Sequence, residues 1–219
     1  MADVAAFDFD GTLTEGGSVM DFLVALRGLP TVAAATAALA PRLAHGALVG
    51  GTAADQTKEL LFRRTLGGVA ASRVDDVSDR FARHHLARHL RSDVHSRFDW
   101  HRERGDPVVI VSASPEVYVR VAATLLGADG VVATRLAVGE GGLLTGRYDG
   151  ANCRGEEKLR RLREWMDESG ADPDRLWAYG NSRGDLRMLL AADVGVNVGR
   201  LGRFGRLRDF PGLRAMAGA

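Results

Sequence analysis

An apolar segment near the N-terminus leads into two acidic residues, and this pattern limits the possible folds more than any other. Val4–Phe7 is followed by Asp8-Phe9-Asp10-Gly11-Thr12. The apolar run predicts a buried strand, and an open parallel α/β sheet binds its ligands at the C-terminal ends of its strands. Asp8 and Asp10 project from the same face of an extended chain, where they repel each other unless a cation or a shared proton is present. The pattern indicates a metal-assisted nucleophile with an acid/base partner; a simple Asp-Gly turn after a strand is the alternative.

From Val108 onward, segments typical of strands alternate with segments typical of helices. Strands are expected at Val108–Val111, Leu176–Tyr179 and Val194–Val198, and helices at Glu116–Leu126, Gly155–Ser169 and Leu186–Ala192. This alternation predicts an α/β fold with a Rossmann-like parallel sheet and helices on both faces. Val131–Val138 and Leu143–Tyr148 flank a Gly-rich turn and predict a β-hairpin.

The stretch between these two parts reads as helical throughout. Apolar residues recur at spacings of three and four over Ser18–Leu26, Thr31–Leu48, Thr52–Leu66 and Ser72–Arg104. Ser18 is expected to cap the first of these helices. We therefore predict a core of residues 1–15 and 105–219 and an inserted helical cap of residues 16–104. The Gly16-Gly17 and Arg104–Pro107 joints would be its hinges.

Composition excludes several functional classes. The 219 residues carry 29 Lys plus Arg against 28 Asp plus Glu, and this balance does not favour nucleic acid as a partner. The Arg-rich end (Arg200, Arg203, Arg206, Arg208, Arg214) is expected to be solvated, and no nucleic-acid motif accompanies it. A single cysteine, Cys153, fits a reducing cytoplasm, and the N-terminus does not resemble a secretory signal. The Ala-rich segment Leu29–Leu48 is interrupted by Pro and Arg, so a membrane span is not expected.

Further polar residues fall at or near the ends of the predicted strands. Ser112 follows Val108–Val111, Asn181 and Asp185 follow Leu176–Tyr179, and Lys158 lies near the start of a helix. Phosphoryl transfer needs a nucleophile, a proton donor and positive charge near the phosphoryl oxygens, and hard oxygen ligands suit Mg²⁺. Each of these residues alone is more often a turn residue or a solvated charge. Their order along the chain is what favours a phosphoryl-transfer site.

Four motifs together resemble the haloacid dehalogenase superfamily of phosphohydrolases. They are Asp8-Phe9-Asp10-Gly11-Thr12-Leu13-Thr14, Val109-Ile110-Val111-Ser112, Lys158, and Gly180-Asn181-Ser182-Arg183-Gly184-Asp185. The position of the helical insertion resembles the type C1 cap, and the hairpin with the segment before Lys158 resembles subfamily IB. That subfamily contains phosphoserine phosphatases and a phosphatidylglycerophosphate phosphatase.

The resemblance implies a role for each matching residue. Asp8 would attack phosphorus to form an aspartyl-phosphate, and Asp10 would protonate the leaving oxygen and then activate water. Lys158 would neutralise the phosphate, which Ser112 and the backbone beside it at Ala113 would bind. Mg²⁺ would be held by Asp8, the Asp10 carbonyl, Asn181 and Asp185. Many members carry Asp at the position of Asn181, and an amide brings no charge, so weaker Mg²⁺ binding is expected.

Substrate choice is open at the level of sequence. Glu15 lies where phosphoserine phosphatases meet the substrate amine, and a solvated turn charge is an equal alternative. Phosphoserine, a sugar or polyol phosphate and a phospholipid phosphate all remain candidates. A non-catalytic phosphate-binding protein and transfer to an acceptor other than water are rival functions.

The histidines of the insertion suggest a second possibility. His84, His85, His89, His95 and His101 are interleaved with Arg80, Arg83, Arg88, Arg91 and Arg97, and His85 and His89 are one helical turn apart. Because cations repel a bound metal, the sequence favours a solvated basic face over a metal site. Such a face would steer anionic substrates or bind to the surface of acidic lipid. The second alternative is disfavoured, because the sequence shows no strong amphipathic anchor with aromatic residues.

Overall fold

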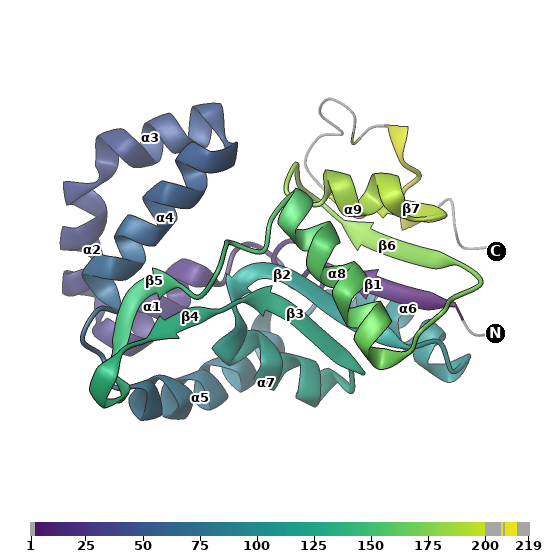
Figure 1. The fold of residues 1–219 in the computed structure, drawn as a ribbon, viewed down its shortest axis with the longest axis horizontal. Helices are drawn as coiled ribbons and strands as arrows, with labels where there is room; N and C mark the ends of the chain where they lie inside the picture. Colours follow the sequence, from purple (N-terminus) through teal and green to yellow (C-terminus); the bar gives the residue numbers. More distant parts are fainter. Residues whose placement is uncertain (1–2, 200–206, 208, 214–219) are drawn as a thin grey trace.

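A five-stranded parallel sheet forms the centre of the computed structural model, which describes residues 3–199, 207 and 209–213 (Figure 1). The predicted arginine-rich end lies outside these residues. The strands are β1 (Val4–Phe7), β2 (Val108–Pro115), β3 (Gly130–Thr134), β6 (Leu176–Gly180) and β7 (Val194–Asn197). Their order is β3-β2-β1-β6-β7, with every neighbouring pair parallel.

Alternate residues of β1 face two separate hydrophobic layers, which is why the whole strand is apolar. Val4 and Ala6 pack with α8 (Glu156–Ser169) and α9 (Leu186–Ala191). Ala5 and Phe7 pack with α7 (Glu116–Leu126) and α6 (Ser92–Glu103) on the opposite face. Helices therefore cover both faces of a parallel sheet, and the predicted fold class is confirmed.

The remaining helices of the insertion match the sequence prediction for Ser18–Leu26 and Thr52–Leu66 to within one residue at each end, whereas the other two expected helices are divided. They are α1 (Val19–Arg27), α2 (Leu29–Ala38), α3 (Ala40–Val49), α4 (Gly51–Thr65) and α5 (Ala71–His89). The expected single helix Thr31–Leu48 is wrong, because α2 ends before Pro41 and α3 begins around it. Proline lacks a backbone N–H and is tolerated in the first turn of a helix but not in its interior.

The expected single helix Ser72–Arg104 is also wrong, because tertiary contacts interrupt it after His89. Leu90 and Arg91 are extended, and α6 begins at Ser92. Leu90 bridges Thr14, and the backbone N–H of Arg91 donates to the Leu13 carbonyl at 2.9 Å. The chain thus leaves the helix to pair with the segment that follows the acidic motif.

Helix α6 lies against the sheet although it belongs to the inserted segment (Figure 1). The Phe98 ring packs 5.3 Å from that of Phe7, and Trp100 packs 5.9 Å from Trp177. His101 is fully buried, and its ring nitrogens contact Asp106 at 2.8 Å and the Tyr179 hydroxyl at 2.9 Å. The division into a core and a cap of residues 16–104 stays a prediction.

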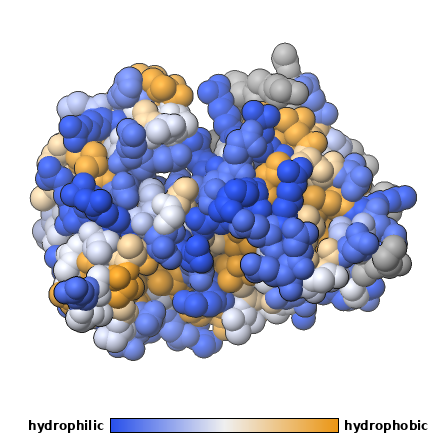
Figure 2. Space-filling view, in the orientation of Figure 1, coloured by the Kyte–Doolittle hydropathy of each residue, from blue (hydrophilic) through white to orange (hydrophobic). Residues whose placement is uncertain are grey.

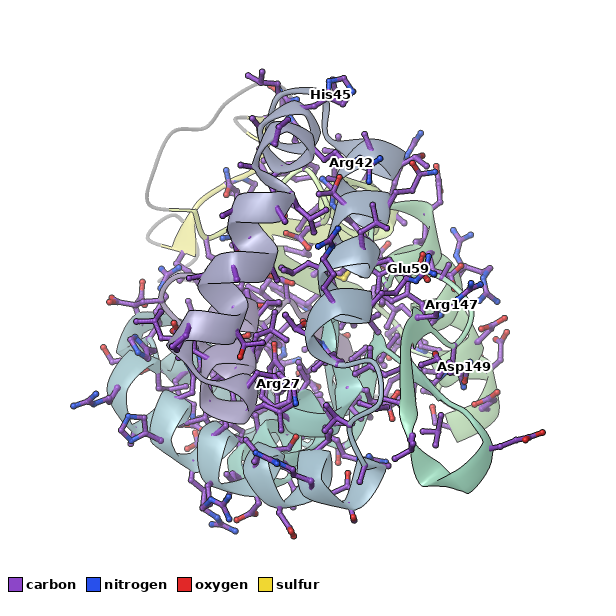
Figure 3. The ribbon with its side chains drawn as sticks, turned by 90° about the vertical axis from the view of Figure 1, so that its left-hand side faces the viewer. Arg27, Arg42, His45, Glu59, Arg147 and Asp149 are labelled. Carbon is purple, nitrogen blue, oxygen red and sulfur yellow. The ribbon has the colours of Figure 1, made fainter. Side chains whose placement is uncertain are left out.

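The predicted hairpin is present in a shortened form. Val131–Val138 is not one strand, because residues 130–134 form β3 at the sheet edge and only β4 (Leu136–Val138) pairs with β5 (Leu144–Tyr148). The apolar run of β3 can pair with β2 in the buried sheet, whereas β5 packs beside α4 and β4 pairs with β5. Figure 3 shows Glu59 of α4 next to Arg147 of the hairpin, and a Glu59 oxygen accepts from the Tyr148 N–H at 3.2 Å.

Within the described part of the chain, no helix combines the length and the apolar composition that crossing a bilayer requires. Hydrophilic side chains gather on the side of the molecule where α4 approaches α8 and α9 (Figure 2).

Candidate active site

The carboxyl ends of β1, β2 and β6 open into a cavity of about 530 Å³. Strand β1 is followed in the chain by its neighbour β2 on one side, while β6 lies on its other side. Ligands bind at such switch points of open α/β sheets, because the loops diverge there. All the predicted site residues line this one cavity: Asp8, Asp10, Glu15, Ser112, Ala113, Lys158, Asn181 and Asp185. Their individual roles stay predictions.

Lys158 joins two buried carboxylates at the floor of the cavity. Its Nζ donates to Asp8 Oδ1 at 2.7 Å and to Asp185 Oδ1 at 2.5 Å. All three residues are at least 94% buried, since their exposed fractions are 1% for Lys158, 6% for Asp8 and 1% for Asp185. Two carboxylates against one ammonium leave a surplus negative charge, and burial of an unbalanced charge is unfavourable.

The pKa values of Asp8, Lys158 and Asp185 are shifted in different directions by burial and by the neighbouring charges. Burial, together with the Asp185 carboxylate, raises the pKa of Asp8 against the opposing effect of Lys158. Burial alone would lower the pKa of Lys158, but the Asp185 and Asp8 carboxylates raise it overall. Burial would raise the pKa of Asp185, but Lys158 and Ser182 hold it below its ordinary value. Lys158 is therefore a fixed cation, and Asp8 needs further positive charge to stay ionised near neutral pH.

The orientation of Asp8 is set from both sides. Thr12 Oγ1 donates to Asp8 Oδ2 at 2.9 Å, while Lys158 engages the other oxygen. The Asp8 backbone N–H donates to the Tyr179 carbonyl at 2.9 Å, which continues the pairing of β1 with β6. The carboxylate is thus held in one rotamer at the mouth of the strand.

Asp10 is held by two serines that the sequence reasoning did not assign to the site. The Ser18 backbone N–H donates to Asp10 Oδ1 at 2.7 Å, and the Ser114 hydroxyl donates to Oδ2. The Ser18 hydroxyl does not cap α1 as expected and instead contacts the Tyr118 hydroxyl at 2.8 Å. The Ser114 N–H donates to Ser112 Oγ at 3.0 Å, so the two serines at the end of β2 are coupled. Ser114 lies two residues after Ser112 on a strand, which is the one local signal for it.

Asn181 and Asp185 belong to a tight loop after β6. Asp185 Oδ2 accepts from the backbone N–H groups of Asn181 at 3.2 Å and Ser182 at 2.9 Å, and from the Ser182 hydroxyl at 2.8 Å. The Asn181 amide lies against Gly11, where an added Cβ would come within 1.9 Å of Nδ2. Gly11 also has φ 77°, a conformation that favours glycine. A side chain at position 11 would therefore displace the Asn181 amide and strain the backbone.

The comparison with known protein families agrees with this geometry. The family described as haloacid dehalogenase-like hydrolase matches residues 5–190, which includes every predicted site residue. The chain belongs to the haloacid dehalogenase-like hydrolases.

Relatives of this hydrolase include curated and solved proteins. It is 36% identical over 190 residues to protein CicA of Caulobacter vibrioides, covering 87% of this chain and 83% of the relative. It is 30% identical over 197 residues to the phosphoserine phosphatase of Halobacterium salinarum, covering 89% and 85%. A Bordetella pertussis structure of unknown function shares the fold with a TM-score of 0.80 at 21% identity, covering 96% and 97%. The prediction of an enzyme of the phosphatase type is confirmed at this level.

Lys58 reaches the site of this hydrolase from α4, and sequence reasoning gave it no role. Its Nζ donates to the Ala113 carbonyl at 2.5 Å and to Asn152 Oδ1 at 3.1 Å. Asn152 Nδ2 in turn donates to Asp55 Oδ1 at 2.7 Å, so two residues of α4 hold the core beside β2. Burial lowers the pKa of Lys58 to about 8. Its rarity was the available signal, because Lys58 and Lys158 are the two lysines of the sequence.

Arg91 is a further residue that pattern reading placed wrongly. It was expected on a solvated face, yet it is 5% exposed and lines the cavity. Its guanidinium donates to the carbonyls of Gly11 at 3.0 Å and Val198 at 2.8 Å, and it pairs with Asp93 at 2.7 Å. Arg91 thereby holds the loop of the first motif against the end of β7.

The expected solvated basic face is also wrong for two of its histidines. His85 is 3% exposed and His101 is fully buried, whereas His84 is exposed. Both buried rings lie among aromatic side chains: His85 stacks on Phe81 and His101 packs against Trp177. The alternation of His and Arg along the sequence hides this, because each residue type has both buried and exposed members: His84 is exposed, whereas His85 and Arg91 are buried.

Proposed function

We propose that this haloacid dehalogenase-like hydrolase is a Mg²⁺-dependent phosphatase that acts on a small phosphorylated metabolite through an aspartyl-phosphate at Asp8. The observation that carries the proposal is the contact of Lys158 with both Asp8 and Asp185 inside the cavity. A buried carboxylate that is fixed in orientation and exposed to a cavity on one side is what a nucleophile requires.

The donor set fits Mg²⁺. Asp8 and Asp185 carry a surplus negative charge next to the Asn181 amide and the backbone of Asp10, and Mg²⁺ prefers such oxygen ligands. These four residues would hold the ion. When bound, Mg²⁺ neutralises the buried charge and polarises the phosphoryl group. Both Asp185 oxygens already accept hydrogen bonds, which favours contact of that residue through water.

The reaction would proceed in two balanced steps. A carboxylate oxygen of Asp8 forms a bond to phosphorus while the ester P–O bond breaks, and Asp10 gives its proton to the leaving alkoxide. Water then attacks the phosphoryl group, Asp10 takes the proton of that water, and phosphate leaves as Asp8 is regenerated. The Ser114 hydroxyl suits this cycle, because it can donate to ionised Asp10 and accept from the protonated form.

The phosphoryl oxygens would bind at the end of β2. Ser112 Oγ accepts from the Ser114 N–H, which directs the hydroxyl proton of Ser112 elsewhere. The Ala113 carbonyl accepts from Lys58 and from Thr134 Oγ1 at 2.7 Å, so the peptide at this position is held firmly. Fixed donors of this kind stabilise charge without reorganisation during the reaction.

Substrate choice would lie with residues at the rim of the cavity. Glu15 lines the cavity just before the Gly16-Gly17 joint, where its carboxylate would meet an amine of the substrate. Residues 16–104 would act as the cap, with that joint and residues 104–107 as hinges. A reducing cytoplasm would keep the buried thiol of Cys153 intact.

The test is turnover of a generic aryl phosphate and of a panel containing phosphoserine, sugar, polyol and lipid phosphates. Asp8→Asn is expected to abolish release of phosphate, while Asp172→Asn, which changes an exposed aspartate far from the cavity, leaves it unchanged. EDTA is expected to remove activity and added Mg²⁺ to restore it. Turnover by the Asp8 variant would overturn the mechanism. Flat rates for the native protein across the panel would favour a phosphate-binding protein, and phosphorylated alcohols among the products would show transfer to another acceptor.

A further inference from the structure

We propose that Asp21, His85 and His89 form a binding site for one divalent transition-metal ion of the Zn²⁺ class, separate from the catalytic cavity. One carboxylate oxygen of Asp21 and one ring nitrogen of each histidine lie within 4.8 Å of one another. None of the three residues lines the cavity that holds Asp8. This metal site would therefore be distinct from the proposed Mg²⁺ site in the catalytic cavity.

His85 supplies the strongest sign of a missing ligand. Its side chain is 97% buried, since 3% is exposed, and its Nε2 has no hydrogen-bond partner in the described part of the protein. The ring stacks on Phe81, with the ring centroids 5.3 Å apart, and the centroid of the tilted Phe9 ring lies 6.1 Å away, so the surroundings are aromatic. An unpaired polar nitrogen is unfavourable in such surroundings. A metal ion bound to this nitrogen would give it the partner that it lacks.

The helices bring the three donors together from two directions. His85 and His89 are one turn apart on α5, with ring centroids 4.7 Å from each other. Asp21 lies in the first turn of α1, which packs against α5. In a bound site, donors about 2 Å from the ion lie about 3–4 Å apart. The donor atoms here lie within 4.8 Å of one another, slightly farther apart than in a bound site. Asp21 is exposed, so its carboxylate is free to rotate closer to the two histidines.

The donor set selects the class of ion. Two imidazoles and one carboxylate suit Zn²⁺ with a water molecule as the fourth ligand, whereas Mg²⁺ prefers oxygen donors alone. Metal binding needs neutral imidazole. Burial, with His89 beside it, holds the pKa of His85 below its ordinary value and so favours that form. Asp10 and Asp21 act on His85 in the opposite sense.

The arginines that argued against a metal in the sequence do not crowd these donors. Arg83 pairs with Asp79 at 3.0 Å, and Arg91 pairs with Asp93 and two carbonyl groups. Arg80 and Arg88 are exposed. Water therefore screens the charges that the linear sequence places next to the histidines.

An ion at this site would connect two segments next to the Gly16-Gly17 joint. The Glu15 N–H donates to the His89 carbonyl at 2.7 Å, and the Ser18 N–H donates to Asp10 at 2.7 Å. Asp21 follows Ser18 by three residues, in α1. Occupation of the site would tie α1 to α5 and stabilise the protein against unfolding, because a ligand that binds only the folded state does so by mass action.

The experiment uses the full chain, freed of metal and kept in millimolar Mg²⁺ to occupy the catalytic cavity. Zn²⁺ is titrated by calorimetry, Co²⁺ by its visible absorption, and Tm is measured with and without Zn²⁺. We expect one Zn²⁺ per chain, a Co²⁺ spectrum typical of N/O coordination and a raised Tm. Asp21→Asn and His89→Gln are each expected to weaken Zn²⁺ binding at least about ten-fold, because the loss of a mere outer-shell partner of a metal ligand already costs about 10- to 100-fold in affinity.

His84→Gln is the matched control, because it removes an exposed histidine from the same helix. It is expected to bind Zn²⁺ like the native protein. Equal affinity in the His84, His89 and Asp21 variants would overturn the proposal, as would absence of saturable binding. Loss of binding in Asp8→Asn, with the Asp21 and His89 variants unaffected, would also overturn it by placing the ion in the catalytic cavity. His85→Gln is not needed for the decision, since a change at a buried position affects folding as well.

Discussion

One lysine of this hydrolase lines the cavity and the other lies in the inserted helix α4, and their pKa values are shifted in opposite directions. Lys158 of α8 contacts two carboxylates, which raise its pKa, whereas Lys58 of α4 contacts a carbonyl and an amide oxygen, and burial lowers its pKa to about 8. Neutral acceptors do not compensate for lost hydration of an ammonium as a carboxylate does. Lys158 therefore stays charged over the whole physiological pH range, whereas Lys58 in the helical insertion has a pKa of about 8 and loses its proton above that pH.

The contrast suggests different roles for the two sides. In the proposed mechanism Lys158 takes part in the chemistry, since its Nζ contacts Asp8 and would fix the charge and orientation of that carboxylate. Lys58 spans from an inserted helix to the end of β2, 55 positions away in sequence, and positions the Ala113 peptide. Variants of the two residues can separate charge stabilisation from attachment of the insertion.

The largest effect is expected for Lys158→Met, which leaves Asp8 and Asp185 facing each other without their shared cation. Removal of a preorganised electrostatic group typically lowers kcat by about 100- to 1,000-fold, and one partner lost from a buried ion pair typically costs about 3 kcal/mol of stability. Phosphate release and thermal unfolding measure the two effects. Native kcat in this variant would remove the distinction between the lysines.

A smaller effect is expected for Lys58→Met, which keeps the length of the side chain but removes its hydrogen bonds. Loss of a charged hydrogen bond predicts a decrease of about ten-fold in kcat/KM. Most of the decrease should appear in KM, because the proposed function places phosphate binding at the Ala113 peptide. Arg64→Met, at an exposed position of the same helix, is the control. A drop in kcat as large as that of Lys158→Met would show that Lys58 takes part in the chemistry.

The smallest effect is a pH dependence of stability that Lys58 should produce. Its pKa is about 8 in the folded protein against 10.5 ordinarily. Between these two values the unfolded state binds more protons, so the free energy of unfolding rises with pH. Below about pH 8 Lys58 is charged in both states, and the cost of burying its charge in the native fold is then largest. Unfolding of the native protein and of Lys58→Met at pH 7 and pH 10 measures the difference, which should shift in favour of the native protein at pH 10. An unchanged difference would mean that Lys58 keeps its ordinary pKa.

Much of the fold and of the candidate site followed from local patterns. The apolar run before Asp8, the β-branched run before Ser112 and the short strand before Asn181 each predicted a buried strand. Once the strands are parallel, their carboxyl ends must share one edge of the sheet. The polar side chains that follow these strands could therefore be predicted to lie close together without any knowledge of side-chain packing.

The helical insertion was harder to predict. Its amphipathic periodicity gave helices but not all of their ends, because the break at Leu90 and Arg91 comes from pairing with Leu13 and Thr14. Periodicity also could not separate the buried His85 from the exposed His84, since the partner helix decides which face is covered. Pro41 was a local signal for the end of α2, and its effect was underestimated.

The sequence by itself determined the parallel sheet, the acidic motif at its edge and eight of the residues that line the cavity. These depend on side-chain alternation and strand topology, which are local or follow from simple rules of chain connection. Only the tertiary structure decided that Ser114 and Ser18 hold Asp10, that Arg91 and Lys58 hold the loops, and that Asp21 meets His85 and His89. Such contacts join residues distant in sequence, and their geometry is set by how whole helices pack on the sheet.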